Sequence, residues 1–249
     1  MEENWTFNEA IQYYMSNPLK DYDYNTYVDK HKVKDFVKDV ICVANEYAYF
    51  TTPKEVDDYD YESLPSYFII KGTHGWNWNI IVRDNFNKGE SISRMKKWLS
   101  MGFNIELEKQ YAQLTPGVLI EEYLGNINDY KFYVFNGSVE LIQVDVDRFG
   151  SHKQNFYDTQ WNIIPVKRHV DSDFTVLGNK PDNLGELIRV IRKLSEKIYN
   201  PPFVRIDIYN IKGKLYFGEY TFTPSCGWGK FFPKEYEIKY GKLISKINH

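Results

Sequence analysis

The chain has 249 residues, of which 43% are apolar and 26% charged, a balance that excludes intrinsic disorder and allows a sizeable buried core. Its 31 Lys and Arg against 34 Asp and Glu give a formal net charge of -3, so bulk charge attracts neither nucleic acid nor an anionic membrane surface. The two cysteines have no zinc-site or disulfide spacing and predict a reduced, cytoplasmic setting. No stretch is long and apolar enough to span a bilayer.

Hydrophobic periodicity predicts three helices, over residues 30–44, 91–101 and 185–200. Pro201 and Pro202 would end the third. Runs rich in β-branched and aromatic residues predict seven strands: SYFIIK, WNIIVR, GVLIEEYL, YKFYVF, VELIQVDV, FVRIDIYN and KLYFGEY. This mixture indicates an α+β fold. Asn136-Gly137 and Lys212-Gly213 favour positive φ, so each predicts a hairpin between its flanking strands.

The last predicted hairpin carries the clearest chemistry. If its loop has an odd number of residues centred on Gly213, Asp207 lies opposite Glu219 and Arg205 opposite Thr221. Strand periodicity then puts these four side chains on one face. Facing carboxylates repel each other, and a divalent cation such as Mg2+ would relieve that repulsion. A solvated polar face with cross-strand ion pairs explains the same residues about as well.

A second candidate site lies earlier in the chain. A strand ending in Lys71 leads into a turn from Gly72 to Gly75, where exposed N–H groups beside an ammonium would favour an anion. A plain hairpin is the alternative. Lys30 stands at the start of the first predicted helix, where the helix dipole does not stabilise it, so either a bound anion or simple solvation would account for it.

Six segments in chain order resemble the successive motifs of the TupA-like ATP-grasp family: TFNEAIQYY, YVDKHKVKDFV, LPSYFIIKGTHGWN, VLIEEYL, DYKFYVFNG, and FVRIDIY with YFGEYTFTPSCG. The resemblance covers nearly the whole chain. It implies an ATP-grasp fold of two α+β lobes, residues 1–124 and 125–249, with the nucleotide site between them. The family is named for a protein of teichuronopeptide synthesis, and its members resemble enzymes that couple a carboxylate to an amine.

The resemblance also implies roles for individual residues. Lys30 and Lys71 would bind the phosphates of ATP, and the turn from Gly72 to Gly75 would close over them. The adenine hinge would be formed by Glu121, Glu122, Tyr123 and Leu124, and Asp129 would bind the ribose. Mg2+ would be held by Asp207, Glu219 and Thr221. Arg205, with Lys71, would stabilise the transferring phosphoryl group. Many ATP-grasp ligases have Asn where this chain has Thr221, which leaves the number of metal sites open.

The acceptor is expected in the segment 148–183, where a local basic cluster could bind an acidic sugar. The cluster consists of Arg148, His152, Lys153 and Arg168, with Lys167 beside them. A solvated loop explains the same residues nearly as well. The implied reaction forms an acyl phosphate from ATP and a carboxylate, then an amide with an amine or amino acid, in cell-surface polysaccharide or teichuronopeptide-like polymer synthesis. Two alternatives stay open: a small-molecule kinase, and an inactive carbohydrate-binding module. The sequence indicates neither the substrates nor the oligomeric state.

Overall fold

A computed structural model describes residues 5–102, 108–111, 114–125, 129–146, 153–168 and 180–244. The chain divides into two compact units. The small unit comprises Tyr22–Phe36 and Val43–Gly125, and the large unit comprises Met1–Asp21, Val37–Cys42 and Asn126–His249. The N-terminal residues, expected in the first lobe, therefore belong to the same unit as the C-terminal half.

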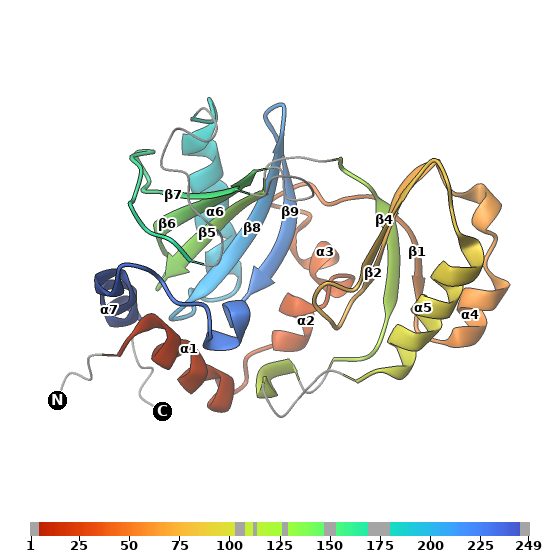
Figure 1. The fold of residues 1–249 in the computed structure, drawn as a ribbon, viewed down its shortest axis with the longest axis horizontal. Helices are drawn as coiled ribbons and strands as arrows, with labels where there is room; N and C mark the ends of the chain where they lie inside the picture. The colour runs from red at the N-terminus through yellow and green to blue at the C-terminus, as the bar shows by residue number, and fades with distance from the viewer. Residues whose placement is uncertain are drawn as a thin grey trace. The chain divides into compact units, whose positions relative to one another are not determined.

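The small unit contains a four-stranded antiparallel sheet in the order β1-β4-β2-β3. Helices α4 and α5 cover one face of this sheet (Figure 1), and their side chains Val56, Met95 and Trp98 are buried in one cluster with the strands. The elements are α2 (Tyr24–Val28), α3 (Lys32–Val37), β1 (Glu46–Phe50), α4 (Pro53–Asp58), β2 (Tyr67–Gly72), β3 (Asn79–Arg83), α5 (Lys88–Ser100) and β4 (Val118–Glu122).

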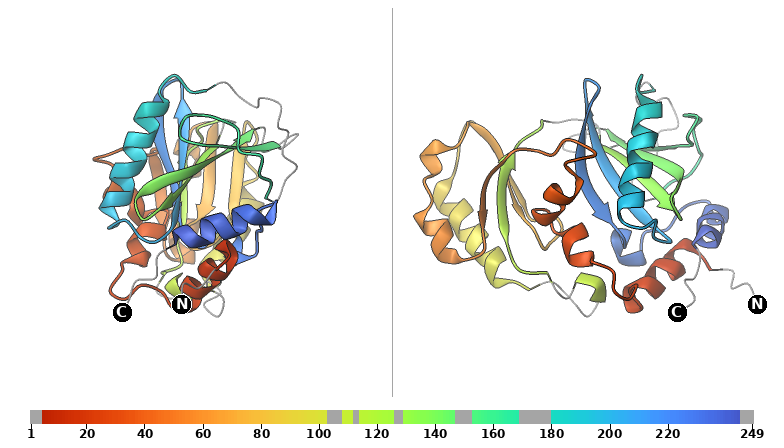
Figure 2. Two further views of the ribbon diagram at one scale, coloured as in Figure 1. Left: turned by 90° about the vertical axis from the view of Figure 1, so that its left-hand side faces the viewer. Right: turned by 180° about the vertical axis from the view of Figure 1, so that it is seen from behind.

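The large unit contains a five-stranded antiparallel sheet in the order β7-β6-β5-β8-β9. Helix α6 lies against one face of it (Figure 2), and the Tyr220 hydroxyl donates to the Leu194 carbonyl across this contact. The elements are α1 (Phe7–Ser16), β5 (Asp129–Phe135), β6 (Ser138–Val146), β7 (Lys153–Tyr157), α6 (Leu184–Lys197), β8 (Val204–Ile211), β9 (Lys214–Thr221) and α7 (Lys234–Leu243).

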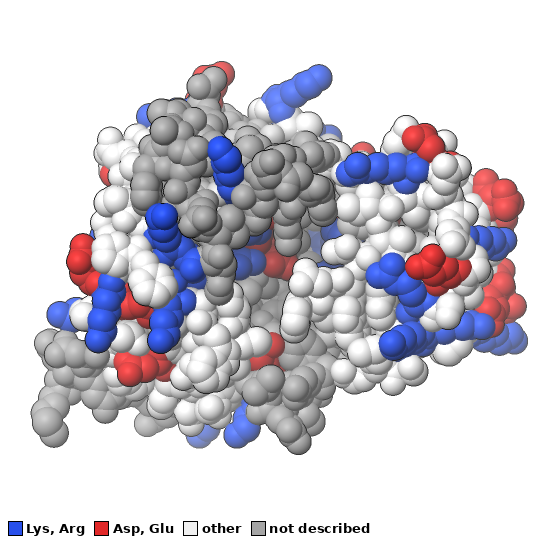
Figure 3. Space-filling model, in the orientation of Figure 1, with Lys and Arg blue, Asp and Glu red and all other residues white. Residues whose placement is uncertain are grey.

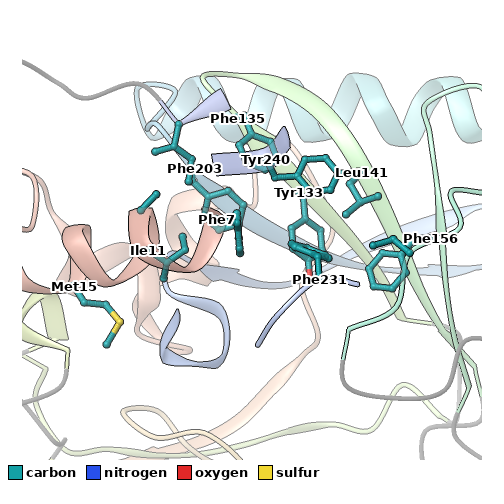
Figure 4. Packing of buried hydrophobic residues seen from close by; sticks show 13 residues of the cluster. Phe7, Ile11, Met15, Tyr133, Phe135, Leu141, Phe156, Phe203, Phe231 and Tyr240 are labelled. Atoms are coloured by element: carbon teal, nitrogen blue, oxygen red, sulfur yellow. The ribbon is translucent and has the colours of Figure 1, made fainter. Parts of the chain in front are cut away.

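A largely aromatic core joins α1 and α7 to the sheet of the large unit (Figure 4). Phe7 on α1 lies 5.0 Å from the Phe203 ring and 5.2 Å from the Phe231 ring, both at edge-to-face angles that aromatic pairs favour. Tyr133 and Tyr240 belong to the same cluster and are fully buried. Much of the unusual aromatic content of the chain therefore fills a core.

The structure confirms all seven predicted strands, both hairpins and two of the predicted helices, α5 and α6. The helix predicted over residues 30–44 was wrong beyond Val37, where α3 ends. The apolar spacing there is real, since Ile41 is buried, but the chain turns and Cys42 forms an isolated parallel β-bridge with Tyr216 of β9. Strands β1 and β7 were not predicted.

Charges of both signs are interleaved over α4 and α5 in the space-filling view (Figure 3). An ion pair joins Nζ of Lys96 on α5 to Oδ2 of Asp57 on α4 at 2.6 Å. Within the described ranges, none of the helices is long and apolar enough to cross a membrane.

Candidate active site

In the small unit, a buried carboxylate lies between two lysines. Glu121 on β4 has a side chain 6% exposed, and its Oε1 lies 2.5 Å from Nζ of Lys71 on β2. Its Oε2 contacts Nζ of Lys34 on α3. Burial opposes ionisation of Glu121, but Lys71 and Lys34 outweigh it and hold the pKa of this carboxyl below its usual value. One carboxylate facing two ammonium groups leaves an excess positive charge that favours an anion.

Nζ of Lys30, a predicted phosphate ligand, donates to the carbonyl oxygens of Gly72 at 3.2 Å and Gly75 at 2.7 Å. The ammonium therefore holds the turn that follows β2. Both glycines pack on the Trp78 ring, and a Cβ added at Gly72 or Gly75 would lie 2.8 or 2.5 Å from ring carbons. Their lack of a side chain is required by this packing.

The buried side chain of His74 ties the same turn to the backbone of neighbouring segments through hydrogen bonds. It is 1% exposed, and its Nδ1 accepts the Gly117 N–H at 3.2 Å. Nε2 must then carry the proton, which it donates to the carbonyl of Met101 at 2.8 Å and of Trp98 at 3.2 Å. Burial lowers the pKa of His74, and the hydrogen bonds to Met101 and Trp98 only partly oppose this.

In the large unit, the predicted register of the acidic hairpin is confirmed. Asp207 on β8 pairs with Glu219 on β9, and Arg205 pairs with Thr221. All four side chains meet on one face, since Arg205 hydrogen-bonds to the other three.

The predicted register is correct for a reason that the sequence did not reveal. The turn has two residues, Lys212 and Gly213 with φ of 51° and 89°, rather than an odd number. A bulge next to Asp207 adds the missing residue, so that Ile208 pairs with Phe217 and Gly218 is the extra position.

The guanidinium of Arg205 joins the two carboxylates. Its Nε lies 2.7 Å from Asp207 Oδ1, and its Nη2 lies 2.8 Å from Asp207 Oδ2 and 2.9 Å from Glu219 Oε1. The Asp207 side chain is 4% exposed, whereas that of Glu219 is 44% exposed. Nη2 also donates to Thr221 Oγ1 at 3.0 Å. Asp207 is thus a buried anchor, and Glu219 is the carboxylate that solvent reaches.

Lys131 on β5 adds a second buried cation, 2.7 Å from Asp207 Oδ2 and in contact with Asp129. Burial opposes ionisation of Asp207, but Arg205 and Lys131 hold its pKa below the usual value. Burial raises the pKa of Asp129, and Lys131 offsets this only in part. Asp129, predicted to bind ribose, therefore lies beside the predicted metal carboxylates, while the other predicted nucleotide-binding residues are in the small unit.

A hydrogen-bonded network continues from this cluster across the same sheet. Gln143 and Gln154 donate to Asp145, which lies 3.9 Å from Lys131. Gln143 Oε1 also accepts from the Tyr133 hydroxyl at 2.8 Å, and that hydroxyl accepts from Arg168 Nη1 at 2.6 Å. Arg168, predicted to bind the acceptor, is 8% exposed and lies within this network.

The remaining predicted residues fall in several places. Glu122 ends β4, where its N–H donates to the Asn45 carbonyl at 2.8 Å, and the Tyr123 hydroxyl accepts from Arg83. Leu124 is half-buried, and Lys153 is exposed at the start of β7. Arg148 and His152 lie outside the described residues.

Sequence reasoning missed Lys34, Lys131 and Asp145. The i, i+4 spacing of Lys30 and Lys34 on the predicted helix, and the i, i+2 spacing of Asp129 and Lys131 on a predicted strand, could have indicated shared faces. The strand order that brings β5 beside β8 is not readable from spacing alone.

The donor chemistry suits Mg2+, because Asp207 and Glu219 are hard oxygen donors directly across the ladder. Within the part of the chain that the structure describes, no group of three or more His, Cys, Asp or Glu side chains is placed to hold a metal ion.

A family model described as TupA-like ATPgrasp matches residues 9–245, nearly the entire chain. The chain belongs to the TupA-like ATP-grasp family. None of the curated proteins matches it. The family assignment confirms the ATP-grasp fold expected from the six sequence motifs.

Two solved D-alanine–D-alanine ligases agree with this ATP-grasp fold. The D-alanine–D-alanine ligase of Bacillus anthracis complexed with ATP is similar with a TM-score of 0.55 and 16% identity, over 88% of this chain and 63% of that one. The D-alanine–D-alanine ligase of Helicobacter pylori has a TM-score of 0.51 and 13% identity, over 88% of this chain and 59% of that one. The ATP-grasp ligase PsnB complexed with a minimal precursor has a TM-score of 0.46 and 14% identity, over 78% of this chain and 51% of that one. The chain thus spans between half and two thirds of these proteins.

Proposed function

We propose that the chain is an ATP- and Mg2+-dependent ligase that activates a carboxylate as an acyl phosphate and couples it to an amine. The observation that carries this proposal is the cluster of Arg205, Asp207 and Glu219 on one face of the β8–β9 hairpin. A phosphoryl-transfer site needs carboxylates for a metal ion and cations for the developing charge, and this cluster has both. The family assignment and its ligase neighbours support the same reaction class.

Lys34 and Lys71 would bind the phosphates of ATP, because they are the pair that a single carboxylate does not neutralise. Lys30 would act on the same phosphates indirectly, by holding the turn from Gly72 to Gly75. Glu121 keeps the two ammonium groups together. The adenine hinge is proposed for Glu121 to Leu124.

Asp207 and Glu219 would hold Mg2+, with Thr221 as a weaker third oxygen, and the bound ion would supply neutralising charge to the phosphates. Arg205 and Lys131 would stabilise the transferring phosphoryl group. No side-chain nucleophile is needed, because the carboxylate substrate attacks the γ-phosphorus and ADP leaves. The amine then displaces phosphate. The acceptor is proposed to be an acidic saccharide in cytoplasmic synthesis of a surface polymer, which the family name suggests.

Isothermal titration with ATP, with and without Mg2+, tests the nucleotide part of this proposal. We expect Mg2+-enhanced binding, and a loss of about 1 to 3 kcal/mol for Lys34→Ala and for Lys71→Ala, the scale of one charge-assisted hydrogen bond. Lys54→Ala, an exposed lysine of α4, is the matched control. Absence of heat both with and without Mg2+ would overturn the proposal in favour of a binding module without catalysis.

ADP release in a matrix of uronic acids and amino acids tests the ligase chemistry. A ligase needs both a carboxylate and an amine for turnover, and hydroxylamine should trap the acyl phosphate as a hydroxamate. ADP release with one substrate, together with a stable phosphorylated product, would indicate a kinase.

A further inference from the structure

The backbone that follows β9 is strained. Ser225, Cys226 and Gly227 have φ of 55°, 50° and 68°, so two non-glycine residues in succession adopt the left-handed conformation. Such conformations are costly, persist only where the surroundings over-determine them, and cluster at ligand-binding sites. We refer to residues 224–232 as the aromatic loop.

The loop is firmly held from the interior of the large unit. The buried guanidinium of Arg168 donates to the carbonyl oxygens of Pro224 and Gly229, each at 3.2 Å. This is the arginine that also contacts Tyr133, so the loop is tied to the network that reaches Asp145 and Lys131. Three further contacts are Gln12 Nε2 to the Gly227 carbonyl at 3.0 Å, Phe231 N–H to Glu237 Oε1 at 2.6 Å, and a pair of backbone hydrogen bonds between Lys167 and Phe232 at 2.8 Å.

This rigid loop presents large apolar side chains to solvent. Trp228 is 72% exposed and Phe232 is 57% exposed, whereas Phe231 between them is buried. Apolar side chains exposed on a strongly held backbone indicate a binding surface, because no entropy is lost in ordering the loop when a ligand arrives.

Positive charge accompanies these rings. Lys230 is exposed between Trp228 and Phe232, and residues 222–234 include two lysines and no Asp or Glu. Lys167 and Phe232 exchange both backbone hydrogen bonds, so they form a directly opposed pair whose side chains project to the same face. Lys167 is also exposed.

We propose that the aromatic loop binds the acceptor as an acidic saccharide, with a sugar ring against Trp228 or Phe232 and a carboxylate other than the reacting one directed at Lys230 and Lys167. This assignment rests on the proposed function and names the surface that takes the acidic saccharide. Rings suit the apolar C–H face of a sugar, and lysines suit the carboxylate of a uronic acid. The loop begins three residues after Thr221, so along the chain it directly follows the hairpin that carries Glu219.

Titration of the full chain with tetragalacturonate, in the absence of nucleotide, tests this assignment. We expect binding by the wild type, and binding weaker by about tenfold in Trp228→Leu and in Phe232→Leu, the usual effect of losing an interface aromatic. Lys230→Gln should weaken binding and reduce its dependence on salt. Tyr199→Ala, an aromatic residue of the same unit that is 80% exposed, should have no effect. The melting temperature and the ATP affinity should be unchanged in all four variants.

Several outcomes would overturn the assignment. These are no binding of tetragalacturonate by the wild type, equal affinity in the two leucine variants, equal affinity for the neutral maltotetraose, or tighter binding of oligothymidylate, which would indicate a nucleic-acid surface. The proposed function is judged separately by ATP titration. If the protein bound the saccharide in a Trp228-dependent way but did not bind ATP, the saccharide-binding surface would be supported and the proposed ligase activity would be rejected.

Discussion

Asp207 and Glu219 face each other, but their burial gives them different structural importance. Asp207 is buried and contacts both Arg205 and Lys131, while the Glu219 side chain is 44% exposed. Removing one partner from a buried ion pair leaves an uncompensated charge, at a cost of about 3 to 5 kcal/mol. Removing an exposed partner costs about 1 kcal/mol or less.

We therefore expect Glu219→Gln to abolish ADP release while the free energy of unfolding changes by less than about 1 kcal/mol. Asp207→Asn should abolish ADP release and also lower that free energy by about 3 kcal/mol or more. Chemical denaturation and an ADP assay measure both effects, and Glu186→Gln on α6 is the exposed control. Equal stability loss in the two hairpin variants would contradict this reading of their burial.

His74 predicts a pH dependence of stability. Burial places its folded pKa below the unfolded value of about 6.5, so the unfolded chain binds the proton more readily. The stability that depends on neutral His74 is fully present above the unfolded pKa and is lost as pH falls toward the folded pKa. Protonated Nδ1 could no longer accept the Gly117 N–H.

Denaturation of wild type and His74→Gln should show this effect between pH 8 and pH 5. We expect the stability advantage of the wild type to shrink on acidification, because the variant lacks the titrating group. A constant difference over this range would assign His74 no part in the pH response.

At the scale of elements, the bulge in β9 sets the geometry of the acidic hairpin. A Cβ added at Gly218 would lie 2.8 Å from the Asp207 carbonyl oxygen, a contact with backbone that cannot move aside cheaply. We expect Gly218→Ala to destabilise the chain by about 1 to 3 kcal/mol, as overpacking does, and to reduce ADP release by displacing Asp207 from Glu219.

Gly185→Ala is the matched control for this substitution. Nothing lies within 4 Å of a Cβ at Gly185, which is in α6, so alanine should be neutral or stabilising there. Wild-type turnover in Gly218→Ala would show that the bulge is not needed to place the two carboxylates.

The same hairpin shows what the sequence could predict and what it could not. Alternation and the positive-φ turn residues were sufficient to predict the strands, and the pairing of Asp207 with Glu219 was correct. The bulge was not predictable, because a glycine within a strand has several structural explanations. The pairing of Lys131 with Asp207 could not be predicted, because it requires β5 to lie beside β8, and that strand order depends on the whole sheet.

Strand β7 and the end of α3 were missed for related reasons. The segment KQNFY carries polar residues that are buried in the structure, so its composition does not resemble a core strand. The periodicity of Val40 and Ile41 suggested further helix, but the chain is held by the bridge from Cys42 to Tyr216. In both cases a tertiary partner overrides local preference.

At the scale of the whole molecule, the chain passes between the two units more than once. The large unit is assembled from Met1–Asp21, Val37–Cys42 and Asn126–His249. Phe7, Ile11 and Met15 of α1 are at most 5% exposed in its core. Gly241 on α7 lies so close to the N-terminal segment that a Cβ there would be 2.0 Å from the Trp5 carbonyl oxygen. The N-terminal residues are thus an integral part of this unit.

This arrangement predicts how fragments will behave. Residues 22–125 contain the complete described core of the small unit, from Phe50 to Ile120, and should unfold cooperatively when expressed alone. Residues 126–249 lack α1 and the segment Val37–Cys42 of the same unit. Losing the three buried apolar side chains of α1 alone removes about 5 kcal/mol, a large part of the stability of an ordinary domain. We expect this fragment to show no cooperative melting and to bind a hydrophobic dye, and a peptide of residues 5–21 added in trans should restore a melting transition. A peptide with Phe7→Ala should restore less, because the Phe7 ring packs against Phe203 and Phe231. If residues 126–249 alone melted as cooperatively as the full chain, the N-terminal helix would be an accessory rather than part of the core.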